Sequence, residues 1–367
     1  MPSRIAIVLP DLRVGGGQRV LLGLARQFVE YGQVVDIVAV FDDGEFVTDL
    51  PFAANYRRLL SRRGDVSIWR SLIALFALVR YLRQVKPDVI LSSMTGTNLL
   101  TVTAYRFARC RSRLLLREAA SFVNLRSRIF PFLMRVLYRR ADTLIAVSTG
   151  VAEDLASVGL DKNKIHVIHN PMDAERLRTM AFEGAASVKE LEIPYIISIG
   201  RLVPQKDHET LLRAYAVSQA MRRYRLVIVG DGELRHHLDS ISKELGVDHR
   251  IAWIGALSNP YGLLSKASLL VLSSRWEGYP NVLLEAAALG VPVVSTDCPA
   301  GPREMLKDGR FGRLASVGDP LSLARAMDEE LNEPSADRED LLRAHQMEIV
   351  AKKYLASMSV ESMSSTL

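Results

Sequence analysis

Short apolar runs that are typical of buried strands alternate with helical segments along almost the whole sequence. One such run, RIAIVLP at residues 4–10, is followed by a glycine-rich loop and an apolar-periodic helix. The same rhythm restarts with YIISIG at residues 195–200 and RLVIVG at residues 225–230. Repeated strand–helix units assemble a parallel sheet with helices on both faces. We therefore predict an α/β fold of two doubly wound, Rossmann-like domains that face a cleft.

The length of the chain agrees with two domains rather than one. A chain of 367 residues exceeds what a single hydrophobic core usually serves. The segment Glu175–Ile193 is polar and is the best candidate for the hinge. We place the first domain at residues 1–180 and the second at residues 181–340. Residues 341–367 would then form a last helix and a Ser- and Thr-rich tail.

Composition is that of an ordinary globular protein, with 49% hydrophobic and 24% charged residues. The two cysteines, Cys110 and Cys298, form no C-x-x-C motif, so neither a disulfide framework nor a zinc site is indicated. A reducing cytoplasm is the natural compartment for such a chain. The first residues read as a strand rather than a signal peptide, and the longest apolar run, Ser71–Val79, is about half of what crosses a bilayer. We therefore expect a cytoplasmic protein.

Positive charge is concentrated in the first half of the chain. Residues 1–180 contain 26 Lys and Arg against 16 Asp and Glu, a net +10, whereas the remainder has 21 against 25, a net −4. The densest cluster is Arg106, Arg109, Arg111, Arg113, Arg117, Arg126, Arg128, Arg135, Arg139 and Arg140. Such asymmetry predicts an anionic partner for the first half.

Part of this basic cluster is also amphipathic. The segment Ser121–Arg140 mixes large apolar side chains with five arginines. A basic segment with aromatic residues can lie on an anionic membrane surface. An ordinary helix whose apolar side faces the core has the same pattern, so both interpretations stay open.

The stretch Ser273–Pro302 carries the pattern most specific for chemistry. It reads as a strand end, a loop with Glu277, a helix with Glu285 and a further strand. Pro280 and Asn281 suit a helix start, because proline fixes φ and its missing N–H is not needed there. Unpaired N–H groups at a helix start attract phosphate, whereas carboxylates accept hydrogen bonds from hydroxyls. A nucleotide sugar combines both kinds of group.

Two carboxylates eight residues apart are common on surface helices, so the surrounding letters carry the assignment. EGYPNVLLE, followed by LGVPVVSTDCP, resembles the E-x7-E signature of the retaining family-4 glycosyltransferases, which have the GT-B fold. The resemblance covers nearly the whole chain, with its specific motifs between Arg201 and Glu304. It implies that Glu277 contacts the hydroxyls of the donor sugar and Glu285 the ribose. It also implies that residues 341–358 form a closing helix that returns to the first domain.

Two cations belong to the same family pattern. Arg201 and Lys206 lie in the loop after a predicted strand, and open parallel sheets bind ligands at the carboxyl ends of their strands. Loop cations are often merely solvated, but G-R-L-x-x-x-K-D resembles the family's diphosphate contact. Arginine offers a directional fork and lysine a compact charge, which together can stabilise the departing nucleoside diphosphate.

The glycine-rich loop of the first half, Gly15–Gly17, has two interpretations besides a merely tight turn. A dinucleotide site is disfavoured, because the G-x-G-x-x-G spacing is absent and no acidic residue ends the next strand in the expected way. The loop resembles the family's first loop, which comes close to the donor phosphates or the acceptor. Glycine is needed there because a side chain would block the approach. In relatives, the backbone near residues 255–257 holds the base, which here is expected to be uracil.

The resulting predictions name two groups of residues. The catalytic candidates are Arg201, Lys206, Glu277 and, on the acceptor side, Glu118. The donor-binding candidates are Gly16, Gly17, Gly200, Arg201, Lys206, Gly255, Leu257, Glu277, Gly278, Tyr279, Pro280, Asn281, Val282 and Glu285. The donor would bind mainly to the second domain and the acceptor to the first.

No two aspartates are separated by one residue, so the Asp-x-Asp metal pair of other transferases is missing. We therefore predict metal-independent catalysis, with no cofactor and the positive field supplied by the two cations and the helix start. The family picture is front-face attack, in which the leaving phosphate takes the acceptor's proton. Many relatives have a histidine shortly after the strand that here ends at Glu118, where this chain has Ala119 and Ala120. Glu118 is therefore only a candidate for the acceptor side.

The motif GPREML at residues 301–306 resembles members that add hexoses or N-acetylhexosamines to polyprenyl-diphosphate-linked glycans. The basic first domain agrees with such an acceptor, which sits at an anionic bilayer. We expect an enzyme at the inner face of the cytoplasmic membrane that builds surface polysaccharide or glycoprotein glycans. The alternatives are a GT-B-fold sugar-nucleotide epimerase and a non-catalytic nucleotide-sugar or polyanion-binding protein. Nucleic acid is disfavoured as a partner, because no aromatic stacking platform interleaves with the basic residues.

Overall fold

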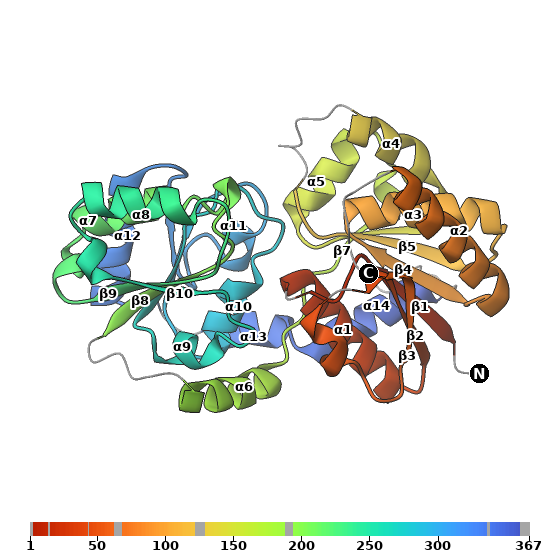
Figure 1. The fold of residues 1–367 in the computed structure, drawn as a ribbon, viewed down its shortest axis with the longest axis horizontal. Helices are drawn as coiled ribbons and strands as arrows, with labels where there is room; N and C mark the ends of the chain where they lie inside the picture. Colours follow the sequence, from red (N-terminus) through yellow and green to blue (C-terminus); the bar gives the residue numbers. More distant parts are fainter. Residues whose placement is uncertain are drawn as a thin grey trace. The chain divides into compact units, whose positions relative to one another are not determined.

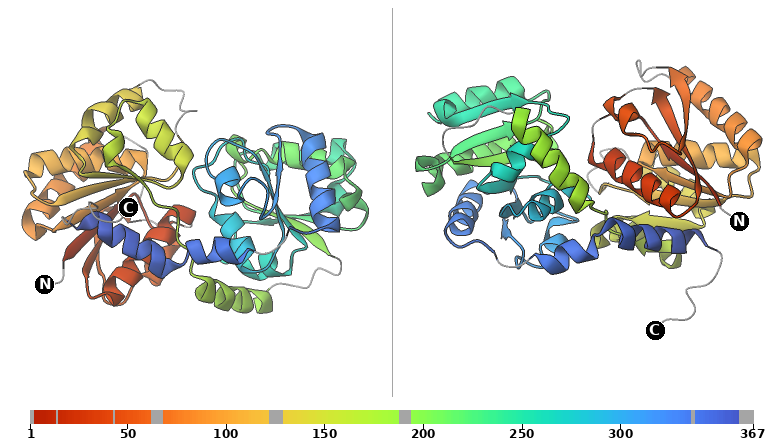
Figure 2. Two further views of the ribbon diagram at one scale, coloured as in Figure 1. Left: turned by 180° about the vertical axis from the view of Figure 1, so that it is seen from behind. Right: turned by 90° about the horizontal axis from the view of Figure 1, so that it is seen from below.

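The computed structural model describes residues 3–13, 15–42, 44–61, 68–121, 129–187, 194–335 and 338–359. The chain forms two compact units, the first of residues 1–171 with 347–367 and the second of residues 172–346. It therefore passes between the units twice, at Pro171–Met172 and at Gln346–Met347. Each unit is a parallel sheet with helices on both faces (Figure 1 and Figure 2).

The first unit contains a seven-stranded sheet in the order β3-β2-β1-β4-β5-β6-β7, and every neighbouring pair is parallel. The strands are β1 (Arg4–Leu9), β2 (Val34–Asp42), β3 (Asn55–Ser61), β4 (Val89–Ser93), β5 (Arg113–Glu118), β6 (Thr143–Ala146) and β7 (Ile165–Val167). The central strands β4 and β5 are buried almost throughout, as expected for a parallel sheet covered on both faces.

The helices of the first unit are α1 (Gly16–Glu30), α2 (Ile68–Val85), α3 (Thr95–Ala108), α4 (Ile129–Leu137), α5 (Thr149–Ser157) and α14 (Met347–Met358), with short 3-10 turns at Glu45–Asp49, Tyr138–Arg140 and Lys162–Lys164. In Figure 1, α1 and α14 lie on one face of the sheet and α2, α3 and α4 on the other. Alternate residues of β1, such as Ile5 and Ile7, pack with Phe28 of α1 and Tyr354 of α14 in one core.

The second unit contains a six-stranded parallel sheet in the order β10-β9-β8-β11-β12-β13. Its strands are β8 (Tyr195–Ile199), β9 (Arg225–Val229), β10 (Ile251–Gly255), β11 (Leu269–Leu272), β12 (Val293–Thr296) and β13 (Arg313–Ala315). Its helices are α6 (Ala174–Ser187), α7 (His208–Val217), α8 (Arg235–Glu244), α9 (Tyr261–Lys266), α10 (Asn281–Ala288), α11 (Pro302–Met305), α12 (Pro320–Asn332) and α13 (Glu339–Ala344). Three further 3-10 turns occupy Pro204–Lys206 (η4), Gln219–Arg222 and Asp248–Arg250.

The predicted fold is confirmed, and the closing helix is confirmed from Met347 on, whereas residues 341–346, which were expected in the same helix, include the end of α13 and belong to the second unit. α14 belongs to the first unit, where its residue Met347 packs on Gly23 of α1 so closely that a Cβ on Gly23 would come within 2.5 Å of Met347 Cε. Farther along α14, Tyr354 Oη accepts a hydrogen bond from Arg117 Nε at 3.1 Å. Among the described residues, no helix is both long and apolar enough to cross a membrane.

The chain crossings differ from the domain boundaries that the sequence suggested at residues 180 and 340. α6 is part of the second unit, since Asn259 Nδ2 donates to Met180 O at 2.7 Å. Met172 N donates to His345 O at 2.7 Å and binds the two crossings to each other. The segment expected to be the hinge therefore lies mostly in α6, and its residues 188–193 are outside the described residues.

Candidate active site

Two loops of the second unit leave its sheet side by side. β8 and β11 are adjacent and parallel, so the loops that follow them start at the same carboxyl edge. The first loop covers residues 200–207 and contains the turn η4. The second covers residues 273–280 and leads into α10. Ligands of open α/β sheets bind at such an edge.

Hydrogen bonds fasten these two loops to each other. Arg275 N donates to Gln205 O at 2.8 Å, and Ser273 Oγ donates to Lys206 O at 2.8 Å. Arg275 Nε also binds Asp207 Oδ2 at 3.0 Å. Asp207 has a left-handed backbone, with φ at 46°, which turns the chain directly into α7. The backbone on both sides of Lys206 is therefore fixed relative to the second loop.

Lys206 and Glu277 form an ion pair at this junction. Lys206 Nζ lies 2.5 Å from Glu277 Oε1, and Ser274 Oγ donates to the same oxygen at 2.6 Å. The Glu277 residue is 7% exposed. Within the described chain, Glu277 Oε2 accepts no hydrogen bond, and Lys206 uses one of its three N–H donors. The pair therefore keeps an acceptor oxygen and two cationic donors for a ligand.

Arg201, in the same loop, is exposed and takes part in none of the ion pairs among the described residues. The loop begins at Gly200, where a Cβ would lie 3.4 Å from Lys206 Cε. Gly230, after β9, has φ at 146°, and a Cβ there would come within 1.9 Å of Gly200 O. Glycine at residue 230 thus allows the two strand ends to pack together. Both predicted cations, Arg201 and Lys206, therefore lie in one short loop that packs against the end of β9.

The helix after Glu277 begins as the sequence indicated. α10 starts at Asn281 with Pro280 as its N-cap residue, whose φ is −76°. Val282 is half-buried in the first turn, and Glu285 lies one turn farther on. Glu285 Oε1 accepts a hydrogen bond from Tyr261 Oη of α9 at 2.8 Å. A tyrosine from a neighbouring helix therefore orients the second carboxylate.

Tyr279 anchors the second loop inside the unit. Its Oη lies 2.5 Å from His345 Nε2, and the two rings stack with centroids 5.6 Å apart. His345 Nδ1 lies 2.6 Å from Leu341 O, and since a carbonyl can only accept, Nδ1 carries the hydrogen. Nε2 is then the acceptor for the Tyr279 hydroxyl. Burial raises the pKa of Tyr279 well above its usual value, which keeps this donor protonated.

The GPRE segment supports the same loop. Gly301 has φ at 94°, and a Cβ on it would meet Gly278 O at 3.0 Å and Pro280 Cδ at 2.8 Å. The glycine therefore permits backbone contact between the two segments. The GPRE segment therefore packs directly against the loop that carries Glu277.

His208 is a buried imidazole next to the cationic loop. It is 2% exposed, and its Nδ1 has no hydrogen-bond partner among the described residues. Burial, and secondarily the charge of Lys206, lower the pKa of His208 to about 4. The ring is therefore neutral at pH 7. No group of three or more His, Cys, Asp or Glu side chains that could hold a metal ion occurs in the described part of the chain.

The residues expected to read the base lie at the same edge of the sheet. Gly255 ends β10 with φ at 81°, and its carbonyl accepts a hydrogen bond from Gly230 N at 2.8 Å. Leu257 is half-buried in the loop that follows. Their role in base binding stays a prediction.

In the first unit, Gly16 and Gly17 open α1, and a Cβ on Gly17 would meet no atom within 4 Å. Open space at Gly17 leaves room for a ligand beside the first turn of α1. A function for this loop, as opposed to a tight turn, remains a prediction.

Glu118, the last residue of β5, is 1% exposed and fully engaged within the first unit. Its Oε1 accepts hydrogen bonds from Tyr138 Oη at 2.5 Å and Asn98 Nδ2 at 2.9 Å. Its Oε2 accepts one from Thr95 Oγ1 at 2.9 Å. Burial raises the pKa of Glu118, and these donors oppose the rise. This arrangement favours a positioning role for Glu118 over proton transfer to substrate.

Sequence reasoning missed several residues that hold the site together. Ser274 and Tyr261 carry hydrogen bonds to the two carboxylates, and His345 holds Tyr279. Ser274 is close to Glu277 in the chain and could have been suspected from that proximity. Tyr261 and His345 lie 24 and 66 residues from their partners, and no local pattern marks them.

Comparison with known proteins identifies the family of each unit. Residues 14–176 match the family described as Glycosyltransferase Family 4. Residues 182–346 match the family described as Glycosyl transferases group 1. The two matches together span most of the chain.

Three of the curated relatives are named as transferases. GalNAc-alpha-(1->4)-GalNAc-alpha-(1->3)-diNAcBac-PP-undecaprenol alpha-1,4-N-acetyl-D-galactosaminyltransferase of Campylobacter jejuni is 27% identical over 348 residues, which are 94% of this chain and 93% of the relative. N-acetylgalactosamine-N,N'-diacetylbacillosaminyl-diphospho-undecaprenol 4-alpha-N-acetylgalactosaminyltransferase of the same organism is 34% identical over 56% of this chain and 54% of the relative. Lipopolysaccharide 1,6-galactosyltransferase of Escherichia coli is 33% identical over 49% of each chain. The chain thus spans about half the length of the latter two.

Solved structures share the fold over almost the whole chain. Anabaena HepE, in complex with UDP and glucose, has a TM-score of 0.81 at 17% identity and covers 97% of this chain and 99% of its own. Sucrose-phosphate synthase from Thermosynechococcus elongatus has a TM-score of 0.82 at 17% identity and covers 96% of this chain and 98% of its own. With two Rossmann-like units and family matches over both of them, this chain belongs to the family-4 glycosyltransferases and has the GT-B fold.

Proposed function

We propose that this glycosyltransferase moves a hexose or N-acetylhexosamine, with retention of configuration and without a metal ion, from a UDP-sugar to a polyprenyl-diphosphate-linked glycan. The observation that carries the proposal is the pairing of Lys206 with Glu277 at the carboxyl edge of a parallel sheet. The pair offers donors for a diphosphate and an acceptor for sugar hydroxyls. A nucleotide sugar presents both groups to one site.

The leaving group is stabilised by cations of one loop. As the bond between the anomeric carbon and the diphosphate oxygen breaks, negative charge grows on that oxygen. Two N–H groups of Lys206 and the exposed guanidinium of Arg201 are available to donate to it. The first turn of α10, at Asn281 and Val282, adds the partial positive charge of a helix start. This field replaces the charge that a metal ion supplies in other transferases.

The carboxylates hold the sugar and the nucleoside. Glu277 Oε2 accepts a hydrogen bond from a hydroxyl of the donor sugar, while Lys206 and Ser274 hold Oε1 in place. Glu285, which Tyr261 orients, accepts a hydrogen bond from a ribose hydroxyl. Charge-assisted hydrogen bonds of this type are about twice as strong as neutral ones, so each carboxylate contributes to donor affinity.

The acceptor hydroxyl attacks the anomeric carbon on the face that the diphosphate leaves. Its oxygen forms the new bond as the old carbon–oxygen bond breaks, and its proton passes to the leaving diphosphate oxygen. No protein base takes part in this route. Glu118 then acts by positioning Thr95 and Asn98 at the start of α3, and Gly16 and Gly17 leave room at the start of α1.

The relatives support the choice of donor and acceptor. The two Campylobacter jejuni enzymes are named for sugars added to undecaprenol-diphosphate-linked glycans, and the E. coli relative is named for lipopolysaccharide. HepE was solved with UDP and glucose. An acceptor carried by a polyprenyl diphosphate would place this enzyme at the inner face of the cytoplasmic membrane.

An exposed face of the first unit agrees with that location. On α4, Ile129, Phe132 and Val136 are each more than half exposed, at the spacing of one helix face, with Arg135 exposed beside them. Residues 122–128 of the predicted amphipathic segment lie outside the described residues. Apolar side chains among arginines suit a surface that binds anionic lipid.

Vesicle sedimentation checks the membrane part. Phe132→Ser should weaken binding to anionic vesicles, whereas Phe182→Ser, which removes an even more exposed phenylalanine from the second unit, should not. Equal binding of the parent protein to neutral and anionic vesicles would contradict this part alone.

One experiment tests the transfer itself. The protein is incubated with UDP-, GDP- and ADP-sugars, each with and without a polyprenyl-diphosphate glycan, in the presence of a chelator. Transfer with an α-linked product from a UDP-α-sugar is expected. Conversion of the donor without acceptor would instead favour a sugar-nucleotide epimerase, and binding without turnover a non-catalytic protein. Loss of transfer on chelation would overturn metal independence.

A further inference from the structure

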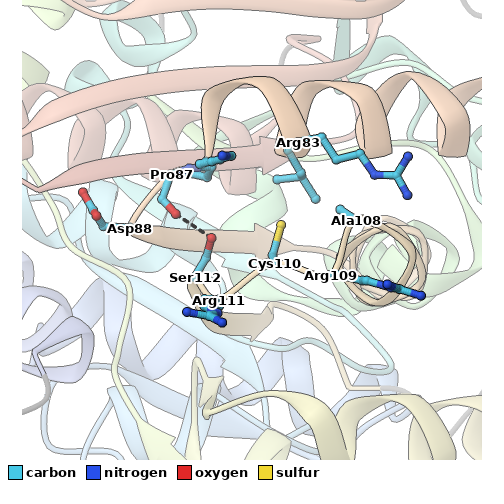
Figure 3. A pocket seen from close by; sticks show the side chains of 10 residues that line it. Arg83, Pro87, Asp88, Ala108, Arg109, Cys110, Arg111 and Ser112 are labelled. Atoms are coloured by element: carbon cyan, nitrogen blue, oxygen red, sulfur yellow. Dashed lines mark hydrogen bonds between the residues drawn. The ribbon is translucent and has the colours of Figure 1, made fainter.

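The first unit has a cationic pocket at the amino edge of its sheet. The pocket has a volume of 530 Å³ and lies between the last turns of α2 and α3. Its floor includes Pro87 and Ser112, where Ser112 Oγ donates to Pro87 O at 2.5 Å. Figure 3 shows the Cys110 thiol projecting into it.

Four cations and one carboxylate line this pocket. The cations are Arg83, Lys86, Arg109 and Arg111, and all four are exposed. None of them takes part in an ion pair within the described residues. The carboxylate is Asp88, whose Oδ2 already accepts a hydrogen bond from Arg4 N at 2.7 Å. With four cations and one carboxylate that forms none of the ion pairs among the described residues, the pocket therefore has a net positive charge.

The two arginines at one end are placed by the helix termini. Arg83 donates from Nη2 to Phe107 O at 2.9 Å, which ties the end of α2 to the end of α3. Arg109 caps α3 with a left-handed backbone, with φ at 53°, a position where glycine would be unstrained. In Figure 3 the guanidinium groups of Arg83 and Arg109 lie at one side of the pocket and Asp88 at the other. An anion at the arginine side avoids the carboxylate.

The pocket is separate from the chemistry proposed above. Lys86 and Asp88 precede β4, and Arg111 precedes β5, so these residues lie at the amino edge of the sheet. The carboxyl edge, with Glu118, lies about 17 Å away along a five-residue strand. A ligand in the pocket would therefore not compete with groups at the carboxyl edge.

We propose that this pocket is a binding site for a phosphate-ester or diphosphate anion, held by Arg83 and Arg109 with Lys86 and Arg111 at the rim. Planar guanidinium groups match phosphate oxygens in pairs, and clustered charges without carboxylate partners favour a multiply charged anion. The anion is either a soluble diphosphate or the phosphate of a lipid headgroup. The exposed Phe107 next to Arg83 offers apolar contact to the latter. This proposal does not rest on the transfer reaction.

Cys110 provides a local readout, because it lines the pocket and the other cysteine, Cys298, is 4% exposed in the second unit. In the full chain with Cys298→Ser, the rate of Cys110 modification by a neutral maleimide is measured at constant ionic strength. Pyrophosphate forms one arm, with sulfate as its control. Phosphatidylglycerol vesicles form the other, with phosphatidylcholine vesicles as their control.

Protection of Cys110 by pyrophosphate at low concentration assigns a soluble diphosphate, and protection by anionic vesicles alone assigns a headgroup. The double variant R83Q/R109Q should raise the apparent Kd by about 100-fold, since each lost charge-assisted contact costs about tenfold. R80Q/R106Q removes the same charge from exposed arginines of α2 and α3 outside the pocket, and should leave the Kd unchanged. Equal losses in both variants, or no protection in either arm, would overturn the site.

Discussion

Lys206 Nζ lies 2.5 Å from Glu277 Oε1, although 71 residues separate the two in the chain. The contact neutralises two charges that are both largely withdrawn from solvent. In the proposed mechanism, donor binding and leaving-group stabilisation both depend on this ion pair.

Replacing Lys206 with alanine should reduce turnover by about 100-fold or more, because one transition-state contact to the leaving diphosphate is lost. The substitution also leaves Glu277 buried without its cation, so the donor KM should rise as well. Steady-state kinetics with saturating acceptor checks both effects. Lys243→Ala, which removes an exposed lysine paired with Asp239 on α8, serves as the control and should retain parent kinetics. Turnover of K206A at the parent level would refute the role of Lys206 in stabilising the leaving diphosphate.

Much of the fold was predictable because buried parallel strands are nearly continuous apolar runs. β4, β8 and β11 are clear in the sequence for this reason. β3 was not predicted, since this edge strand is partly exposed and its sequence, NYRRLLS, shows no apolar run. Edge strands lack the burial on which the pattern depends.

The site was predictable only in part. Strand order places Lys206 and Glu277 at one edge, and the helix start at Asn281 follows from Pro280. That the two charges pair directly, and that Tyr261 reaches Glu285, depends on tertiary packing that leaves no periodic signal. Glu118 ends a strand as predicted, but side chains from α3 and from the turn at Tyr138 cover it.

Tyr261→Phe tests the orientation of Glu285. The change removes one hydroxyl that donates to Glu285 Oε1 at 2.8 Å and leaves the ring packing in α9 intact. A hydrogen bond to a charged group is worth about 1.5–3 kcal/mol, so the donor KM should rise by roughly tenfold or more while kcat changes less. Tyr195→Phe, which removes another buried hydroxyl of the same unit that donates to Leu263 O, is the matched control. Equal effects of both changes on KM would indicate a general loss of packing.

His208 should make the protein less stable in mild acid. The pKa of His208 is about 4 when folded and about 6.5 when unfolded, so only the unfolded state gains a proton between these values. The contribution to stability is complete above pH 6.5 and is lost as the pH falls toward 4. Its size is at most about 3 kcal/mol, since each pKa unit corresponds to about 1.4 kcal/mol.

Denaturant unfolding at several pH values between 4 and 7 measures this loss. His208→Gln should flatten the dependence, because glutamine does not titrate, and its amide can replace an imidazole whose Nδ1 has no partner among the described residues. His236→Gln, at an exposed histidine of α8, should keep the parent slope. An unchanged slope in H208Q would assign the acid sensitivity to other groups.

Two substitutions of Glu118 distinguish a positioning role of this residue from a role in proton transfer. Glu118→Gln keeps an oxygen for Tyr138 and Asn98 and places an amide against Thr95 Oγ1, which can accept instead of donate. Turnover of E118Q should therefore stay within a few-fold of the parent. A loss of about 100-fold or more, with parent stability, would instead indicate a general base. Glu118→Ala removes the acceptor of the buried Tyr138 hydroxyl, of one N–H of the buried Asn98 amide and of the half-buried Thr95 hydroxyl, so thermal or denaturant unfolding should show a loss of about 3 kcal/mol or more. Retained activity in E118Q together with unfolding of E118A is the combination that a positioning residue produces, because the first change preserves the hydrogen-bond geometry and the second removes it.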